Sequence, residues 1–354
     1  MTAAGPSPAL RWTPDLCAPA RFLGASCDRC VTACPRAALG RVAGGIAPGA
    51  GDCDGCGLCV PACPTGALEV SALPRSVLAS KLAMASAAER PVVVRCERAA
   101  ASRSAVGVPC VGLLDETTLV EALLRDGAAG VTLQTGDCGA CPRGAALERV
   151  FPGTLRAARG LLASTGRSTE LIRVDAVPDA EAGHVNTARR GLFRTLLGGL
   201  SQTVAPPPTG PIPSRRERLL RLLRSSSPKL HPATLDALPA AKPEIGDGCW
   251  GCTVCEHACP TRAIRRTETS REVVLEIDAD SCVACAACAE SCGPQAITYR
   301  APAPIRRPIE GGMQEAARLA VRACVHCGES FAGRRDALAC PGCRRRAPVT
   351  AGGG

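Results

Sequence analysis

Apolar positions between residues 76 and 180 fall into short β-branched runs that alternate with longer stretches of helical spacing. The stretches predict helices over 115–127, 143–150 and 153–164. The runs predict four strands, at 91–96, 105–110, 129–138 and 170–177. Because strands that alternate with helices form parallel sheets with right-handed crossovers, this segment is expected to be a small parallel α/β domain.

The pattern elsewhere predicts fewer elements. Residues 271–280 predict a strand between two cysteine-rich loops. Two basic amphipathic helices are expected at 189–200 and 214–224, separated by a proline-rich stretch that predicts a stiff linker. Each helix can be interpreted as a solvated basic face that packs locally, or as a docking surface for an acidic redox partner.

Cysteine usage changes this picture. The chain has 354 residues, of which 24 are cysteine and only 2% are aromatic. The N-terminal stretch lacks the apolar region of a signal peptide, and no stretch is apolar enough to cross a membrane. We therefore expect the reducing cytoplasm, where clustered cysteines hold metal or do redox work. The formal charge of +10 does not indicate nucleic-acid binding, since cysteines that bind iron are anionic thiolates.

The cysteine group in residues 246–305 contains two runs of C-x2-C-x2-C-x3-C spacing. Three thiolates of such a run hold one [4Fe-4S] cluster, and the fourth holds the cluster of the other run. The predicted ligand sets are Cys249, Cys252, Cys255 and Cys292 for one cluster, and Cys259, Cys282, Cys285 and Cys288 for the other. The alternative is a pair of zinc knuckles. The doubled pattern resembles the two-cluster bacterial ferredoxins, which implies a ferredoxin-like 2[4Fe-4S] domain here.

The group in residues 1–75 resembles the same domain, but it lacks one cysteine. A first [4Fe-4S] site is predicted at Cys34, Cys53, Cys56 and Cys59. The second site has only three cysteines, Cys27, Cys30 and Cys63, and Gly24 occupies the position of the first ligand. We predict that the nearest unassigned cysteine, Cys17, supplies it. The alternative is that Cys17 is an idle thiol, and that the site holds a three-iron cluster or none.

Cysteines also end three of the strands predicted in residues 76–180. They are Cys96, Cys110 and Cys138, and Cys141 follows one loop onward. Ligands bind at the carboxyl ends of parallel strands, so these four thiols predict a cofactor site at one sheet edge. The alternative is that they are buried structural cysteines.

This segment resembles the delta, iron–sulfur subunit of methanogen-type hydrogenases, which links the hydrogenase to heterodisulfide reductase. The resemblance covers about residues 90–150 and rests on Cys96, on VPCVGLLDETTLVEALLRDGAAGV and on GDCGAC. It implies a [2Fe-2S] cluster at the sheet edge. The family's second cysteine and tryptophan near the first site are absent here, and its GDCHY has become GDCGAC, so Cys141 is the candidate for the missing ligand.

The last group consists of two C-x2-C knuckles. Twelve residues separate the two pairs, which are Cys324 and Cys327, and Cys340 and Cys343. This spacing predicts a four-thiolate zinc ribbon over 320–346, and it also resembles rubredoxin knuckles, which hold iron. Residues 181–245 contain no cysteine and are assigned to a basic helical, proline-rich linker.

Catalytic motifs are missing from this sequence. It has only four histidines, no phosphate-cradling glycine loop and no dinucleotide fingerprint. We expect an α+β multidomain protein with two ferredoxin-like domains, a small parallel α/β domain and a zinc ribbon, holding four [4Fe-4S] clusters, one [2Fe-2S] cluster and one zinc. Its expected role is a non-catalytic subunit that relays electrons to or from a hydrogenase, a molybdenum-type enzyme such as a formate dehydrogenase, or a heterodisulfide-reductase-like complex. The alternative is a redox-sensing assembly or regulatory protein that binds a client or nucleic acid through its zinc ribbon and basic helices.

Overall fold

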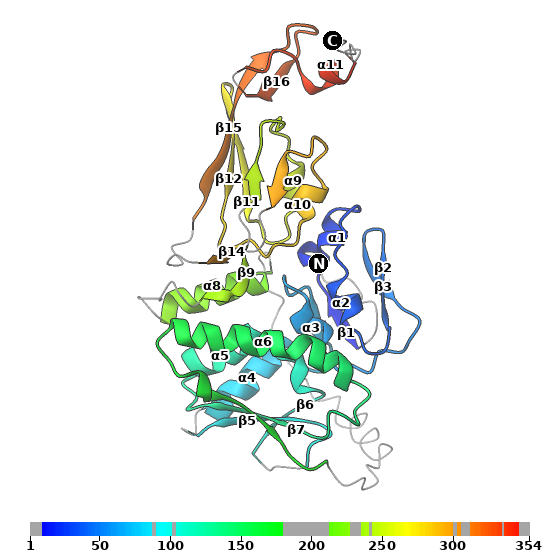
Figure 1. Cartoon of the computed structure of the whole chain (residues 1–354), viewed down its shortest axis with the longest axis vertical. Helices are drawn as coiled ribbons and strands as arrows, with labels where there is room; N and C mark the ends of the chain where they lie inside the picture. The colour runs from blue at the N-terminus through cyan, green and yellow to red at the C-terminus, as the bar shows by residue number, and fades with distance from the viewer. Residues whose placement is uncertain are drawn as a thin grey trace, which may run out of the picture.

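The computed structural model describes most of the chain outside the cysteine-free linker. Its residues are 9–86, 90–100, 104–179, 212–226, 235–240, 243–299, 303–305, 312–334 and 336–346. The basic helix expected at 189–200 and most of the proline-rich stretch lie outside them. In Figure 1 an α/β domain lies at the lower end and the C-terminal knuckles at the upper end, with two smaller units between.

The α/β domain contains a four-stranded parallel sheet in the order β6-β5-β7-β8. The strands are β5 (Val92–Cys96), β6 (Val106–Val108), β7 (Val131–Thr135) and β8 (Ile172–Ala176). They correspond to the four runs expected from the sequence. Helices α4 (Arg75–Ser86), α5 (Glu116–Leu124) and α6 (Gly144–Ser164) pack against the sheet.

Helix α6 is continuous, although the sequence predicts two helical stretches on either side of Pro152. A proline inside a helix removes one backbone hydrogen bond. The apolar face of α6, which includes Phe151 and Leu161, is buried in the domain core. Burial of this face offsets the lost hydrogen bond, so the helix passes through the proline.

Helix α8 (Arg215–Ser226) is part of the α/β core, although its sequence lies in the predicted linker. Its buried leucines are Leu219, Leu220, Leu222 and Leu223, which pack with α5. Arg221 and Arg224 are exposed, but Arg215 and Arg216 are buried. The first turn of the 214–224 helix is therefore neither a solvated basic face nor a docking surface for an acidic partner, because its two arginines lie inside the molecule.

The first smaller unit has the layout expected of a ferredoxin-like domain. Strand β1 (Leu10–Trp12) pairs antiparallel with β4 (Leu68–Val70), and the hairpin of β2 (Leu39–Val42) and β3 (Gly45–Pro48) lies between them in the chain. Short helices precede, follow or contain cysteines of this unit: η1 (Pro14–Leu16), α1 (Ala18–Arg21), α2 (Arg29–Thr32) and α3 (Cys59–Ala62).

The second unit repeats this layout. Strand β10 (Pro243–Ile245) pairs antiparallel with β13 (Ile297–Tyr299), and the hairpin of β11 (Ile264–Glu268) and β12 (Glu272–Ile277) lies between them in the chain. Its helices are α9 (Val254–Ala258) and α10 (Ala287–Glu290). The strand expected at 271–280 is thus present as β12. A further two-stranded sheet, β9 (Leu235–Ala240) with β14 (Ala303–Ile305), lies between this unit and α8 (Figure 1).

The C-terminal knuckles are joined to the second unit by a shared sheet. Strand β15 (Gln314–Ala323) pairs with β12, and β16 (Ser330–Gly333) pairs with β15, giving a sheet of order β11-β12-β15-β16. Helix α11 (Pro341–Arg346) follows. Within the part of the chain that the structure describes, no helix is both long and apolar enough to span a membrane.

Candidate metal centres

The same backbone turn follows the last cysteine of each of the four cysteine runs in the two smaller units. The backbone N–H of the fourth residue after each cysteine donates to its Sγ, over 3.2–3.3 Å. The residue before that donor has a positive φ in every case. The donor pairs are Ala38 to Cys34, Ala67 to Cys63, Ala263 to Cys259, and Ala296 to Cys292. Each N–H stabilises a thiolate, so the turn prepares the sulfur to bind a cation.

Sequence reasoning did not identify this turn. Its signal is an alanine four residues after the cysteine. At Cys292 the next residue is Gly293 instead of proline, yet the same turn forms. The proline is therefore not what sets the sulfur's hydrogen bond.

The first outer site, defined as Cys34, Cys53, Cys56 and Cys59, lies on the side of the first unit that faces the α/β domain. Burial raises the pKa of Cys56 to about 12. Burial also raises the pKa of Cys59 well above its usual value, and the nearby thiols of this site add to the shift. These four thiols therefore lie close enough to repel one another as thiolates, which a bound cation would relieve.

The first inner site, defined as Cys17, Cys27, Cys30 and Cys63, lies where the first unit meets the second, since Cys285 lines its cavity. All four cysteines line one cavity. Cys17 is buried between η1 and α1, and burial raises its pKa to about 11, with Cys63 and Cys27 adding to the shift. A cysteine at position 24, where the usual spacing would place the first ligand, would crowd its neighbour, because a Cβ at Gly24 would lie 2.7 Å from the Phe22 ring. The structure thus brings Cys17 to the three cysteines that lack a partner.

Two further sets occupy the second unit. The second inner site is Cys259, Cys282, Cys285 and Cys288, and the second outer site is Cys249, Cys252, Cys255 and Cys292. Burial raises the pKa of Cys285 and of Cys288 to about 12, and the other thiols of their site contribute to both shifts. Burial likewise raises the pKa of Cys255 to about 12, together with the thiols of the second outer site. The fourth cysteine of each run therefore lies near thiols of the other run.

The sheet-edge site is defined as Cys96, Cys110, Cys138 and Cys141, and these cysteines line one cavity. Cys96 ends β5, and the other three follow β6 and β7. Burial raises the pKa of Cys110 to about 11. Arg143 lines the same cavity, and its Nη1 donates to the carbonyl oxygen of Pro109 over 2.8 Å. The parallel sheet thus gathers the four thiols at its carboxyl edge.

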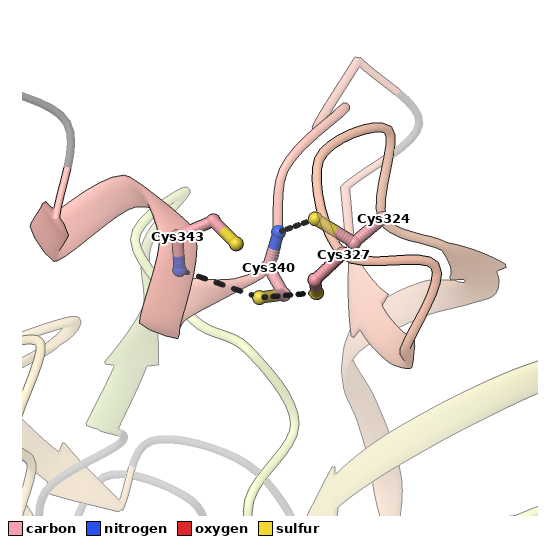
Figure 2. Close-up of side chains that lie close together, drawn as sticks. All are labelled: Cys324, Cys327, Cys340 and Cys343. Carbon is pink, nitrogen blue, oxygen red and sulfur yellow. Dashed lines mark hydrogen bonds between the residues drawn. The ribbon is translucent and has the colours of Figure 1, made fainter.

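The C-terminal site is defined as Cys324, Cys327, Cys340 and Cys343, and its four Sγ atoms lie within 4.8 Å of one another (Figure 2). The Cys327 and Cys340 sulfurs are 3.7 Å apart. Tetrahedral coordination with metal–sulfur bonds of about 2.3 Å places sulfurs roughly 3.8 Å apart, so the spacing fits one metal ion. The backbone N–H of Cys340 donates to the Cys324 sulfur over 3.2 Å and lowers the pKa of Cys324 to about 6.

Comparison with known proteins agrees with the geometry of the two ferredoxin-like units. Residues 248–296 match the family model of the 4Fe-4S dicluster domain, and residues 50–69 match that of the 4Fe-4S binding domain. No curated protein matches the chain. The chain therefore contains two ferredoxin-type 4Fe-4S domains, and these support a role in iron–sulfur electron transfer.

The donor sets fit the cofactors that these domains imply. Iron in cubane clusters is held by four cysteine thiolates, and each ferredoxin-type set offers four thiols. Burial raises the pKa of most of these thiols, so they carry protons when no metal is bound. A bound metal would replace those protons. The turns that donate to the cysteine sulfurs supply the second layer of hydrogen bonds that such sites need.

Proposed function

We propose that this protein is an electron-transfer subunit that relays single electrons between redox proteins in the cytoplasm. It would hold [4Fe-4S] clusters at the two inner and two outer sites, a [2Fe-2S] cluster at the sheet-edge site and zinc at the C-terminal site. A bound iron–sulfur cluster takes up and releases one electron without forming or breaking a bond to substrate. The proposal is supported by protein contacts that join neighbouring members of the five predicted cluster sites.

The first step of this series joins the sheet-edge site to the first outer site. Arg143 lines the sheet-edge cavity, and its Nε forms an ion pair of 2.9 Å with Asp54 of the first unit. Asp54 accepts a hydrogen bond from the backbone N–H of Cys56. Cys56 also belongs to the same apolar core as Cys96 and Cys110. Protein packing is therefore continuous from one site to the next.

The second step joins the two ferredoxin-type units. Cys285 of the second inner site lines the cavity that holds the first inner site, and it packs near Cys27. The Ser26 backbone N–H donates to Glu290 Oε2 over 2.9 Å across this contact. Ala25 and Ala287 are fully buried beside it. Each unit thus places its inner site at the contact with the other unit.

The C-terminal site follows the second outer site. Arg345 of α11 stacks over Trp250, which lies next to Cys249, at 5.3 Å from the ring centroid. Strand β15 also ties this region to the hairpin of the second unit. A zinc ion would hold these knuckles closed as a structural site. Iron in the same four thiolates would instead add a redox centre, which metal analysis distinguishes.

The partners that suit this series are oxidoreductases that exchange single electrons with ferredoxin-type domains. The resemblance of residues 90–150 to the hydrogenase delta subunit favours a hydrogenase or a heterodisulfide-reductase-like complex, and a formate dehydrogenase is a further candidate. We propose that electrons enter from one protein and leave to another.

Purification of the tagged full chain under anaerobic conditions from its own cells tests this function. We expect an oxidoreductase subunit to co-purify, and we expect the visible absorption of the preparation to bleach on reduction and return on reoxidation. Recovery of nucleic acid with strong salt dependence, without a redox partner, would instead support the regulatory alternative. A chain that holds no iron under these conditions would refute the proposal.

A further inference from the structure

Arg215 is buried against the first inner site. Its backbone N–H donates to the carbonyl oxygen of Thr65 over 2.8 Å. Its Nη1 donates to the carbonyl oxygen of Pro61 over 2.8 Å. Thr65 and Pro61 each lie two residues from Cys63, a ligand candidate of that site. Arg215 is thus bonded to the backbone on both sides of this cysteine, through its own backbone N–H at Thr65 and through its guanidinium at Pro61.

Arg215 belongs to α8, and the leucines of this helix are part of the α/β core. The first inner site that Arg215 contacts lies where the two ferredoxin-type units meet, since Cys285 of the second unit lines the same cavity.

Neighbouring carboxylates keep Arg215 positively charged. Its Nε lies 3.3 Å from Glu116 Oε1. Burial lowers the pKa of Arg215, but Glu116 and Asp115 raise it more, so the guanidinium stays protonated. The cation lies between the carboxylate of Glu116 and the carbonyl groups beside Cys63.

A buried cation changes the redox equilibrium of a nearby cluster. A cluster held by four thiolates is anionic, and reduction adds one negative charge. A positive charge beside it therefore stabilises the reduced form. At an effective dielectric constant of about 20, a unit charge about 10 Å away changes such an equilibrium by roughly tenfold or more.

We propose that Arg215 is a positioning residue that raises the reduction potential of the first inner site. This inference rests on the proposed function, since it requires a cluster at that site. The consequence is that an electron is held most favourably at the contact between the two ferredoxin-type units. Helix α8 of the α/β domain thereby favours electron transfer across that contact, although it supplies no ligand.

Anaerobic redox titration of the full chain, followed by electron paramagnetic resonance, tests the proposal in R215Q and E116Q. R215Q should lower the potential of one cluster signal by about tenfold in its equilibrium constant, which is about 59 mV for one electron. E116Q should shift the R215Q-sensitive signal in the opposite direction, because it removes a negative charge. R221Q, an exposed arginine on the same helix, is the matched control and should change nothing.

Opposite shifts from opposite charges would not follow from a merely structural role. If R215Q does not fold, E116Q still tests the proposal, because it should raise the potential of one cluster signal. Unchanged potentials in the folded variants, at the wild-type iron content, would overturn the inference and leave the proposed function intact. A wild-type chain without iron would instead refute the proposed function itself.

Discussion

Cys17→Ser is expected to make one cluster labile and to leave the others intact. Cys17 lines the first inner cavity with Cys27, Cys30 and Cys63, while the first outer site has its own four cysteines. A cubane with one thiolate missing leaves one iron open to solvent, and that iron is lost on oxidation. The expected change is the loss of about one iron from a total of about sixteen to eighteen.

Folding should be affected little by this substitution. Serine is close in size to cysteine, and Cys17 is 9% exposed. The buried hydroxyl costs on the order of 1 kcal/mol if it finds a hydrogen-bond partner. The loss of iron can therefore be attributed to the missing thiolate and not to unfolding of the unit.

Electron paramagnetic resonance of air-exposed wild type and variant measures this effect. The variant should show a three-iron signal that the wild type lacks. Ser26→Ala is a matched control, since Ser26 lies beside Cys27 and is not a candidate ligand. A three-iron signal in freshly prepared, anaerobic wild type would show that Cys17 is not a ligand and would refute this reasoning.

Two further predictions address the α/β domain. Cys138→Ser should remove one spectroscopic species and leave the cubane signals unchanged, because the sheet-edge site lies in its own domain core; collapse of all signals together would mean that the cysteines are structural or that the domains are not independent. Leu223→Ala should lower the free energy of unfolding by about 2–5 kcal/mol in anaerobic urea titration, because Leu223 is fully buried between α8 and α5. Met84→Ala is the control at an exposed position, and it should change the free energy of unfolding by less than about 0.5 kcal/mol. An equally small effect of Leu223→Ala would show that α8 is not part of the core.

Local patterns in the sequence were sufficient for much of the fold. The four β-branched runs correspond to β5 to β8. In β5 and β7 buried and partly buried residues alternate, whereas only Ile172 is buried in β8. The alternation at 271–280 likewise corresponds to β12. Cysteine spacing predicts the candidate ligand sets, because a tight loop brings cysteines two residues apart to one side.

Long-range packing could not be predicted in this way. The leucine stripe of α8 shows that one face is buried, but periodicity does not say which domain covers it. For the same reason the burial of Arg215 and Arg216 was missed. The position of Cys285 beside the first inner site was missed as well, since it lies 222 or more positions along the chain from the cysteines of that site.

The metal content of the full chain, purified anaerobically, tests the central claim most directly. Four cubanes hold about sixteen iron atoms and one two-iron cluster adds about two, so we expect about sixteen to eighteen iron atoms and one structural zinc per chain. A value in this range would support the proposed series of cluster sites, and its upper end requires the two-iron cluster at the sheet edge. Iron near eight atoms per chain, roughly the content of one two-cluster ferredoxin domain, would contradict it.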